Sequence, residues 1–260
     1  MIPAIRQHMV SLLLSIAAFG ALASDNLAGH LSDNQRITSQ VLHYSLQFRV
    51  YQPPGLTGQL AYPVLYVTDG QWYIRDGQLP ARADALIQQG ELPPLFIVFI
   101  DSRNPDQLTE NRRNQEFMCN PDYARFIVSE LIPVIEQTYP VSADADNRGI
   151  AGLSFGGLNA ACVGLMASHV FHKVGMQSPA SDQHVALITQ QYQRTATAPL
   201  TLFLSAGTRN DNVSAIREFR KVLVKQGHQV TYREVREGHN WKNWAPLQRD
   251  MLLALFPHSQ

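Results

Sequence analysis

Short apolar runs alternate with amphipathic segments along most of the chain, from about Val41 onward. Five runs are almost continuously hydrophobic and end in Gly, Ser, Asp or Thr: "YPVLYVTDG", "LFIVFIDS", "RGIAGLS", "KVGMQS" and "LTLFLSAGT". Runs of this length and character are typical of strands that are buried on both faces of a parallel sheet. They therefore predict the central strands of an α/β fold.

Helical patterns lie between these runs. They are "ARADALIQQG", "PDYARFIVSELIPVIEQTY", "GGLNAACVGLMASHV", "VSAIREFRKVLVKQG" and "PLQRDMLLALF". At the start, "VLHYSLQFRVYQP" alternates like an antiparallel edge hairpin closed by Pro53-Pro54-Gly55, and near the end "VTYREV" predicts one more strand. Repeated β-α-β units predict a three-layer α/β sandwich with a mostly parallel sheet, whose reactive groups follow the strand ends.

The first residues have a different pattern. Arg6 and His8 precede an apolar stretch from Met9 to Leu22, and Ala21-Leu22-Ala23 ends it. A basic start, a short apolar segment and an A-x-A end predict a secretory signal peptide, residues 1–23, cleaved after Ala23. The alternative, a membrane anchor, needs about 20 apolar residues. We expect a mature catalytic domain, residues 24–260, in a bacterial periplasm, with no stable membrane insertion.

Composition adds two limits. The 260 residues are 45% hydrophobic, which suits one domain with a large core, and 21 basic residues balance 21 acidic ones, so nothing points to nucleic acid. Cys119 falls in a predicted loop and Cys162 on a predicted buried helix, and we expect two inert thiols rather than a disulfide. No Cys/His spacing resembles a metal site, and no metal or organic cofactor is expected.

One motif carries chemistry. Gly152-Leu153-Ser154-Phe155-Gly156 is G-x-S-x-G, and it stands between a predicted strand and a predicted helix. In that context the serine occupies a sharp, strained turn with its hydroxyl above the sheet. Gly152 and Gly156 are expected where side chains would collide with neighbouring backbone. Ser154 is the predicted nucleophile.

A serine needs a base, and the base needs an orienting acid. In this fold the chain order is Ser, acid, His. Asp211 follows the strand "LTLFLSAGT", although an Asp there also commonly caps a helix. Asp182, Glu234 and Glu237 are weaker candidates. Among the later histidines, His239 in "REGHNWKNW" directly follows the last predicted strand, and it is the predicted base.

An oxyanion needs two backbone N–H donors. One is expected at Phe155, after the nucleophile. The other is expected in the tight turn after "PVLYVTDG", at Gln71, beside which Trp72 could line the pocket or belong to the core.

The chain resembles the esterase D-like family of α/β-hydrolases, with its closest likeness to the enterochelin (enterobactin) esterases. The stretches that carry the resemblance are "PVLYVTDGQWY", "LPPLFIVFIDSR", "NRRNQEFMCNPDY", "AGLSFGGLNA" and "GHNWKNW". The resemblance implies an α/β-hydrolase fold without a large lid and carries over Ser154 and His239. The spacing Gly207-Thr208 to Asp211 is similar to the feruloyl esterase branch. The lack of the N-terminal domain of the cytoplasmic enzymes resembles the periplasmic form.

By this resemblance the partner is a small ester, an anionic catecholate siderophore or its ferric complex. A neutral protein then needs local cations, and Arg103, Arg112 and Arg113 follow a strand end at the expected rim of the site. The alternative is a solvated loop in which Arg113 pairs with Glu116. Two other functions stay open: a feruloyl or other carbohydrate-ester hydrolase or acyltransferase, and a siderophore-binding protein without catalysis.

Overall fold

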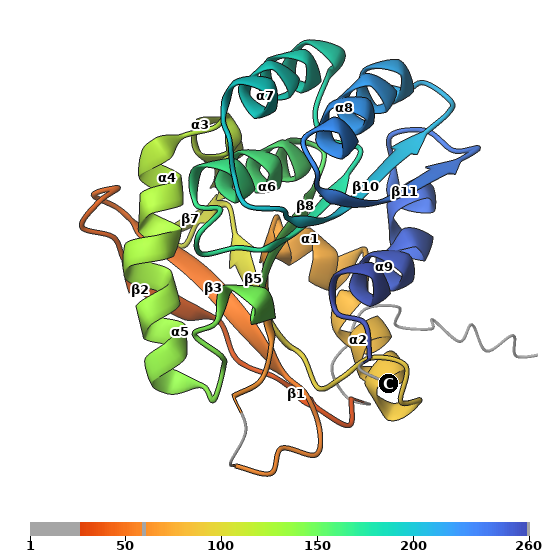
Figure 1. Ribbon diagram of the computed structural model, residues 1–260. Coiled ribbons are helices and arrows are strands. Elements are labelled where there is room, and N and C mark those ends of the chain that lie inside the picture. Colours follow the sequence, from red (N-terminus) through yellow and green to blue (C-terminus); the bar gives the residue numbers. More distant parts are fainter. Residues whose placement is uncertain (1–26, 59–60, 259–260) are drawn as a thin grey trace, which may run out of the picture.

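The computed structural model describes residues 27–58 and 61–258, and in them a central sheet lies between two layers of helices (Figure 1). The strand order is β1-β3-β5-β4-β8-β9-β10-β11, with β2 paired to β3 beside this path. All neighbours from β5 to β11 pair in parallel, and β3 pairs antiparallel with β5. The strands are β1 (His30–Leu31), β2 (Gln35–Thr38), β3 (Ser45–Gln52), β4 (Val64–Thr68), β5 (Phe96–Asp101), β8 (Arg148–Leu153), β9 (Lys173–Gln177), β10 (Thr201–Gly207) and β11 (Gln229–Val235).

The two faces of the sheet form separate hydrophobic cores. Along β4, Val64 and Tyr66 belong to one core, whereas Leu65 and Val67 belong to the other. Both faces are therefore buried, which explains the continuous apolar runs and confirms the predicted three-layer α/β architecture.

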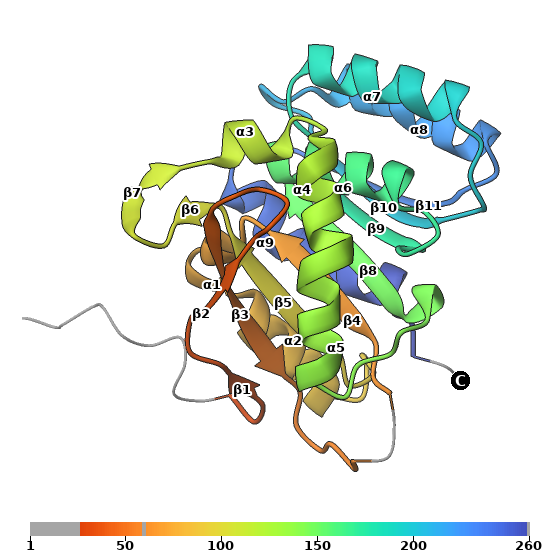
Figure 2. The ribbon, with the colours of Figure 1, turned by 90° about the vertical axis from the view of Figure 1, so that its left-hand side faces the viewer.

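The helices divide between the two faces (Figure 2). One layer contains α3 (Arg113–Phe117), α4 (Pro121–Phe126), α5 (Ile132–Thr138), α6 (Phe155–Met166), α7 (Asp182–Arg194) and α8 (Val213–Lys225). The other contains α1 (Gly70–Arg75), α2 (Leu79–Gln88) and α9 (Trp241–Leu255). The described elements also include a small antiparallel pair, β6 (Arg103–Asn104) and β7 (Gln107–Asn111), and a short helical turn, η2 (Ala145–Asn147).

The predicted N-terminal hairpin was wrong in its position. Residues from Ser45 onward form one strand, β3, and its hairpin partner is β2, which precedes it in the chain. The turn lies at residues 39–44, where His43 has a φ of 61°. Pro53 follows the end of β3 and closes no hairpin. The apolar alternation identified the strand, but it could not show on which side its partner lies.

The predicted helix over "PDYARFIVSELIPVIEQTY" contains a π-helical turn, η1 (Ile127–Leu131), between α4 and α5. Pro133 has no N–H, and its ring would clash with the carbonyl of Ser129 in a regular α-helix. The wider turn just before Pro133 relieves that clash and keeps the helix continuous.

The prediction of two free thiols was wrong, because Cys119 and Cys162 form a disulfide. Cys119 lies between α3 and α4, and Cys162 is buried on α6, as expected. The two residues are 43 positions apart in the chain, so nothing local indicates the bond. It arises because the α3–α4 segment packs across α6.

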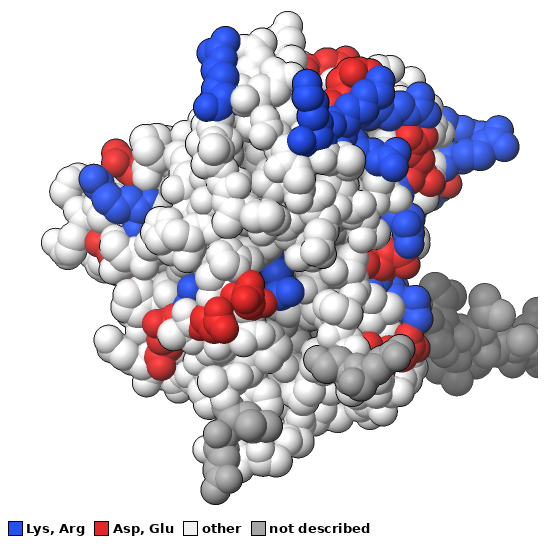
Figure 3. Space-filling view, viewed as in Figure 1, with Lys and Arg blue, Asp and Glu red and all other residues white. Residues whose placement is uncertain are grey.

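Two observations concern the whole molecule. None of the helices in residues 27–58 and 61–258 is long and apolar enough to cross a membrane. The predicted signal peptide, residues 1–23, lies outside the described residues. On the face shown in Figure 3, Lys and Arg gather over α8 and β11, where Arg217, Arg220, Lys221 and Lys225 line a surface groove.

Candidate active site

Ser154 occupies the turn between β8 and α6. Its φ of 54° and ψ of −125° lie in a region that residues with a side chain rarely adopt, so the turn is strained. The Ser154 N–H donates to the carbonyl of Gln177, and the Ser154 carbonyl accepts from the N–H groups of Leu158 and Ala180. These three hydrogen bonds hold the backbone in the strained conformation and leave the hydroxyl at the sheet edge.

Gly152 permits this turn. A Cβ atom at Gly152 would overlap the carbonyl of Gly156 and Thr68 Oγ1. The predicted collision with backbone is confirmed at Gly152, whereas a Cβ atom at Gly156 would meet the side chains of Thr68 and Asp69, at 2.8 and 2.9 Å.

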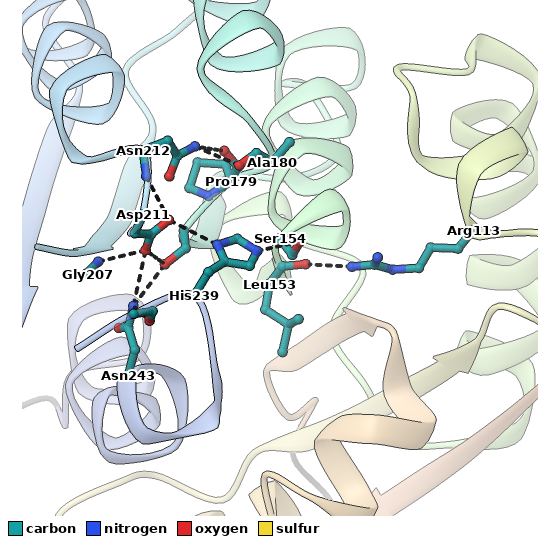
Figure 4. A network of polar contacts seen from close by, with 12 residues as sticks. Arg113, Leu153, Ser154, Pro179, Ala180, Gly207, Asp211, Asn212, His239 and Asn243 are labelled. Atoms are coloured by element: carbon teal, nitrogen blue, oxygen red, sulfur yellow. Dashed lines mark hydrogen bonds and ion pairs between the residues drawn. The ribbon is translucent and has the colours of Figure 1, made fainter. Parts of the chain in front are cut away.

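His239 lies within hydrogen-bonding distance of Ser154. Its Nε2 is 2.8 Å from Ser154 Oγ, and its Nδ1 is 3.0 Å from Asp211 Oδ1 (Figure 4). The imidazole packs edge-on against Trp244, with ring centroids 4.9 Å apart. The three residues predicted from separate strand ends are therefore joined in one chain of contacts.

Asp211 is surrounded by donors. Its Oδ2 accepts from Ser178 Oγ at 2.7 Å and from the Gly207 N–H at 2.8 Å, and its Oδ1 accepts from the Asn212 N–H at 2.9 Å. Burial raises the pKa of Asp211, but the hydrogen bonds from His239, Ser178 and the backbone outweigh it and lower the pKa to about 2. An ionised Asp211 can only accept, so His239 Nδ1 carries the proton and Nε2 is free to accept from Ser154.

Sequence reasoning missed two residues that hold this acid. Ser178 ends the run "KVGMQS", and Asn243 lies in "GHNWKNW", so both were visible as polar residues beside predicted strand ends. The Asn243 amide is fully buried and donates to Ser178 Oγ, to Asp211 Oδ2 and to the Gly238 carbonyl. It thereby links the loop of the acid to the loop of His239.

Arg113 pairs with Asp69 rather than with Glu116. Its Nε donates to both oxygens of the Asp69 carboxylate, at 2.9 and 2.8 Å, and the Asp69 side chain has no exposed surface. Burial raises the pKa of Asp69 to about 6, although Arg113 and Ser102 act to lower it. The cation expected at the rim is therefore neutralised in the interior.

The other two predicted arginines also have partners. Arg103 forms a bidentate ion pair with Asp101, in which Nε donates to Oδ1 and Nη2 to Oδ2, and 30% of its side chain stays exposed. Arg112 pairs with Glu110, donates to the Ser45 carbonyl and lies over the Tyr44 ring. Neither residue presents an unpaired charge.

One surface cleft lies at Ser154, and a separate cavity lies at the turn that contains Gln71. A cleft of about 380 Å³ is lined by Ser154, Phe155, Ala180, Ser181, Asp182, Asn210, Asp211, Asn212 and His239. A second cavity of about 280 Å³ is bordered by Gln71, Trp72, Arg49, Arg75 and Arg103, among others. His239 is 32% exposed, so solvent and substrate can reach it. Among the described residues, no three His, Cys, Asp or Glu side chains are grouped as a metal site would require.

The sheet order, the strained serine turn and the Ser–His–Asp contacts define an α/β-hydrolase fold. The chain belongs to the Esterase family, described as "Putative esterase", whose profile matches residues 39–255.

Among curated proteins, the chain is 30% identical over 200 residues to the iron(III) enterobactin esterase of Dickeya dadantii. The aligned residues cover 70% of this chain and 45% of that protein. It therefore spans about half the length of that relative. It is also 24% identical to the uncharacterized protein YjcH of Bacillus subtilis, over 82% of this chain and 92% of that one.

Solved structures agree on the fold. The enterobactin esterase of Shigella flexneri, crystallised in the presence of enterobactin, has a TM-score of 0.76 at 24% identity and covers 85% of this chain and 58% of that one. A ferulic acid esterase has a TM-score of 0.69 at 22% identity and covers 88% and 99%.

Proposed function

We propose that this chain hydrolyses carboxylic esters with Ser154 as nucleophile, His239 as base and Asp211 as the orienting acid. The observation that carries the proposal is the 2.8 Å contact between Ser154 Oγ and His239 Nε2 at a strained G-x-S-x-G turn. A binding protein would need neither the strain nor the histidine.

The proposed reaction begins when Ser154 Oγ attacks the ester carbonyl and its proton passes to His239 Nε2. Asp211 stays ionised and stabilises the imidazolium through Nδ1. His239 then protonates the departing alkoxide, which leaves an acyl-serine. Water attacks the acyl group while His239 accepts its proton, and the serine is regenerated when His239 returns that proton to Oγ.

The developing oxyanion is assigned to the backbone N–H groups of Gln71 and Phe155. Both residues lie in the first turn of a helix, α1 and α6, where N–H groups have no acceptor within the helix. Removing one such donor costs about a hundred- to a thousandfold in turnover in serine hydrolases.

The proposed substrate is the ester of a catecholate siderophore or its ferric complex. Support comes from the family, from relatives named iron(III) enterobactin esterase, and from the segment "NRRNQEFMCNPDY". Trp72 and Arg103 border the cavity beside Gln71 and are assigned to substrate contact. Arg112 is assigned with them, since its N–H donates to the carbonyl of Ser102, the neighbour of Arg103. Any iron arrives as part of the substrate.

We further propose export to the periplasm after cleavage of residues 1–23, which leaves residues 24–260 as the catalytic domain. The disulfide supports this, because such bonds persist in oxidising compartments. Fractionation and N-terminal sequencing test it, and a mature N-terminus at Ser24 is expected.

The decisive experiment is incubation with enterobactin, with and without iron, followed by mass spectrometry of the products. Ser154→Ala should lower turnover about a million-fold and abolish labelling by a fluorophosphonate. The matched control is Ser214→Ala, an exposed serine on α8, which should be labelled like the wild type. Failure of the wild type to react with the probe would instead favour a siderophore-binding protein.

A second candidate is a feruloyl ester hydrolase or an acyltransferase of the same family. The spacing from Gly207 to Asp211 and the similarity to a ferulic acid esterase favour it. A higher kcat/KM on a feruloyl ester than on enterobactin would select this candidate.

A further inference from the structure

Arg113 contacts two segments that are separate in the chain and meet at the site. It begins α3, and its Nε donates to both oxygens of Asp69, the residue directly before α1. The Arg113 side chain is 16% exposed and that of Asp69 is fully buried, so solvent screens the pair weakly. The ion pair therefore holds the start of α1, which contains Gln71.

The rest of the guanidinium group faces the serine turn. Arg113 Nη2 lies 3.4 Å from the Leu153 carbonyl, directly before Ser154, on the far side of Ser154 from His239 (Figure 4). The guanidinium carbon is 5.3 Å from the centre of the Phe155 ring and 5.2 Å from the centre of the Trp72 ring. One side chain therefore touches Phe155 itself and the immediate neighbour of Gln71.

Both segments need such support. Asp69 has a φ of 58° and Ser154 a φ of 54°, and a non-glycine residue in such a region is strained by about 1–3 kcal/mol. A lateral contact adds to the restraint, because Gln71 Nε2 donates to Ser102 Oγ at 3.1 Å and Ser102 Oγ lies 3.4 Å from Asp69 Oδ1. The buried carboxylate thus joins Arg113, Ser102 and the Gln71 turn.

We propose that Arg113 is a positioning residue that sets the spacing between the backbone N–H groups of Gln71 and Phe155 through its contacts with Asp69, Leu153, Trp72 and Phe155. The inference rests on the proposed function, and it gives Arg113 a role other than contact with an anionic substrate. A displacement of about 1 Å in such a site can cost about a hundredfold in rate. The guanidinium supports the oxyanion donors and leaves the substrate to other residues.

A positioning role and a substrate-binding role for Arg113 predict different effects of substrate charge. Arg113→Met should lower kcat about a hundredfold on neutral p-nitrophenyl acetate and equally on the anionic p-nitrophenyl hydrogen succinate, with KM changed less than about threefold. Arg113→Lys restores the charge but not the planar fork, and it should recover only part of the loss. A loss confined to the anionic ester, or a kcat for Arg113→Met within about threefold of the wild type on both esters, overturns the proposal.

Asp69→Asn supplies a second variant of almost unchanged size. It avoids leaving a buried carboxylate without its cation, which makes it the safer variant if Arg113→Met does not fold. It should show the same charge-independent loss. The double variant should be no worse than Arg113→Met, because both changes break the same Arg113–Asp69 ion pair. Additive losses in the double variant contradict the shared role.

The matched control is Arg148→Met. Arg148 is also buried, pairs with Glu136, and lies at the opposite end of β8, the strand that leads to Ser154. Both Arg148→Met and Arg113→Met should lower the melting temperature, but Arg148→Met should leave kcat unchanged. An equal fall in kcat would mean that the loss reflects general destabilisation, which overturns the proposal.

The outcomes separate this inference from the proposed function. A wild type that hydrolyses neither ester and resists the fluorophosphonate overturns both. A wild type whose hydrolysis requires Ser154, combined with an unaffected Arg113→Met variant, overturns the positioning role alone.

Discussion

Asp211 shows how a single carboxylate can be kept ionised in a largely enclosed position. Hydrogen bonds from Ser178, from His239 and from two backbone N–H groups converge on its two oxygens. The alternative role as a helix cap finds no support, since Asn212 occupies the N-cap of α8. The carboxylate is oriented toward the imidazole.

Replacement of this acid tests its role. Asp211→Asn should lower kcat by about ten-thousandfold, because the amide can present its NH₂ group to Nδ1 and reverse the tautomer of His239. Steady-state kinetics on p-nitrophenyl acetate measure the effect. A loss below about tenfold would mean that Ser154 and His239 act as a pair without this acid.

Asp211 also contributes to the acid stability of the fold. Its pKa is lowered on folding to about 2, so its contribution is present above the unfolded value near 3.8 and is lost as pH falls through about 2. Asp211→Asn should flatten the dependence of the unfolding free energy on pH in that range, as urea titrations would show. An unchanged slope would contradict the lowered pKa.

The pKa of Glu116 is shifted in the opposite direction to that of Asp211. It is 1% exposed, its Oε2 has no hydrogen-bond partner among the described residues, and burial raises its pKa to about 8 despite the hydrogen bond from Tyr44. Its stabilising contribution is complete below the unfolded value of 4.5 and is lost as pH rises through about 8. Glu116→Gln should therefore gain stability relative to the wild type as pH rises, by about 1.4 kcal/mol for each unit of pKa shift. Urea titrations at about pH 5 and about pH 8 measure it, and a constant difference would contradict it.

Among single residues, those that directly follow strands could be placed at the site from the sequence. The contacts of His239 with Ser154 and Asp211 could be predicted because the fold places strand ends together. The partner of Arg113 could not, since Asp69 is 44 positions away and the nearer Glu116 looked equally suitable.

Among the elements, α6 directly follows the proposed nucleophile, Ser154, and carries one end of the disulfide at Cys162. The bond from Cys162 to Cys119 ties α6 to the loop that follows α3, the helix that begins with Arg113. The covalent link therefore restrains the relative placement of α3 and α6.

Removing the disulfide measures how much it contributes to the unfolding free energy. Closing a loop of 43 residues should stabilise the fold by about 2–4 kcal/mol, mainly by restricting the unfolded chain. Cys119→Ala combined with Cys162→Ala should lower the unfolding free energy by that amount. A reductant should destabilise the wild type but leave the double variant unchanged, and equal sensitivity of both proteins would refute the assignment.

Elements rich in apolar residues were predictable, whereas short or polar ones were not. The parallel strands and the helices α2, α6, α8 and α9 follow from their apolar positions. The sequence analysis did not identify α1 or α3, each six residues or fewer, nor α7, whose 13 residues are mostly polar with Val185, Ile188 and Tyr192 buried. The turn of the N-terminal hairpin was misplaced because proline marked a strand end rather than a reversal.

Over the whole chain, 21 Lys and Arg balance 21 Asp and Glu, but the charges around Ser154 are not balanced. The described residues that line the cleft around Ser154 include Asp182 and Asp211 but no Lys or Arg. The three arginines predicted at its rim carry carboxylate partners, namely Arg103 with Asp101, Arg112 with Glu110 and Arg113 with Asp69. These three ion pairs therefore add little long-range attraction for an anion at this opening.

The salt dependence of kcat/KM measures how strongly the protein attracts an anionic substrate. Because paired charges generate little field beyond a Debye length, kcat/KM for p-nitrophenyl hydrogen succinate should change less than about threefold between about 20 and 300 mM NaCl. The neutral acetate ester serves as the reference. A fall of more than about tenfold with the anionic ester alone would reveal electrostatic steering.

The three-layer architecture was predictable from the alternation of elements, but the pairing of charges across layers was not, since it depends on contacts between distant loops. The contact between Ser154 and His239 also joins the two layers. Ser154 adjoins α6, in one helical layer, while His239 precedes α9, which packs in the other. Ser154 contacts its proposed base, His239, only after both layers have docked. A nascent or partly folded chain is therefore expected to hold an unreactive serine until α9 packs against the sheet.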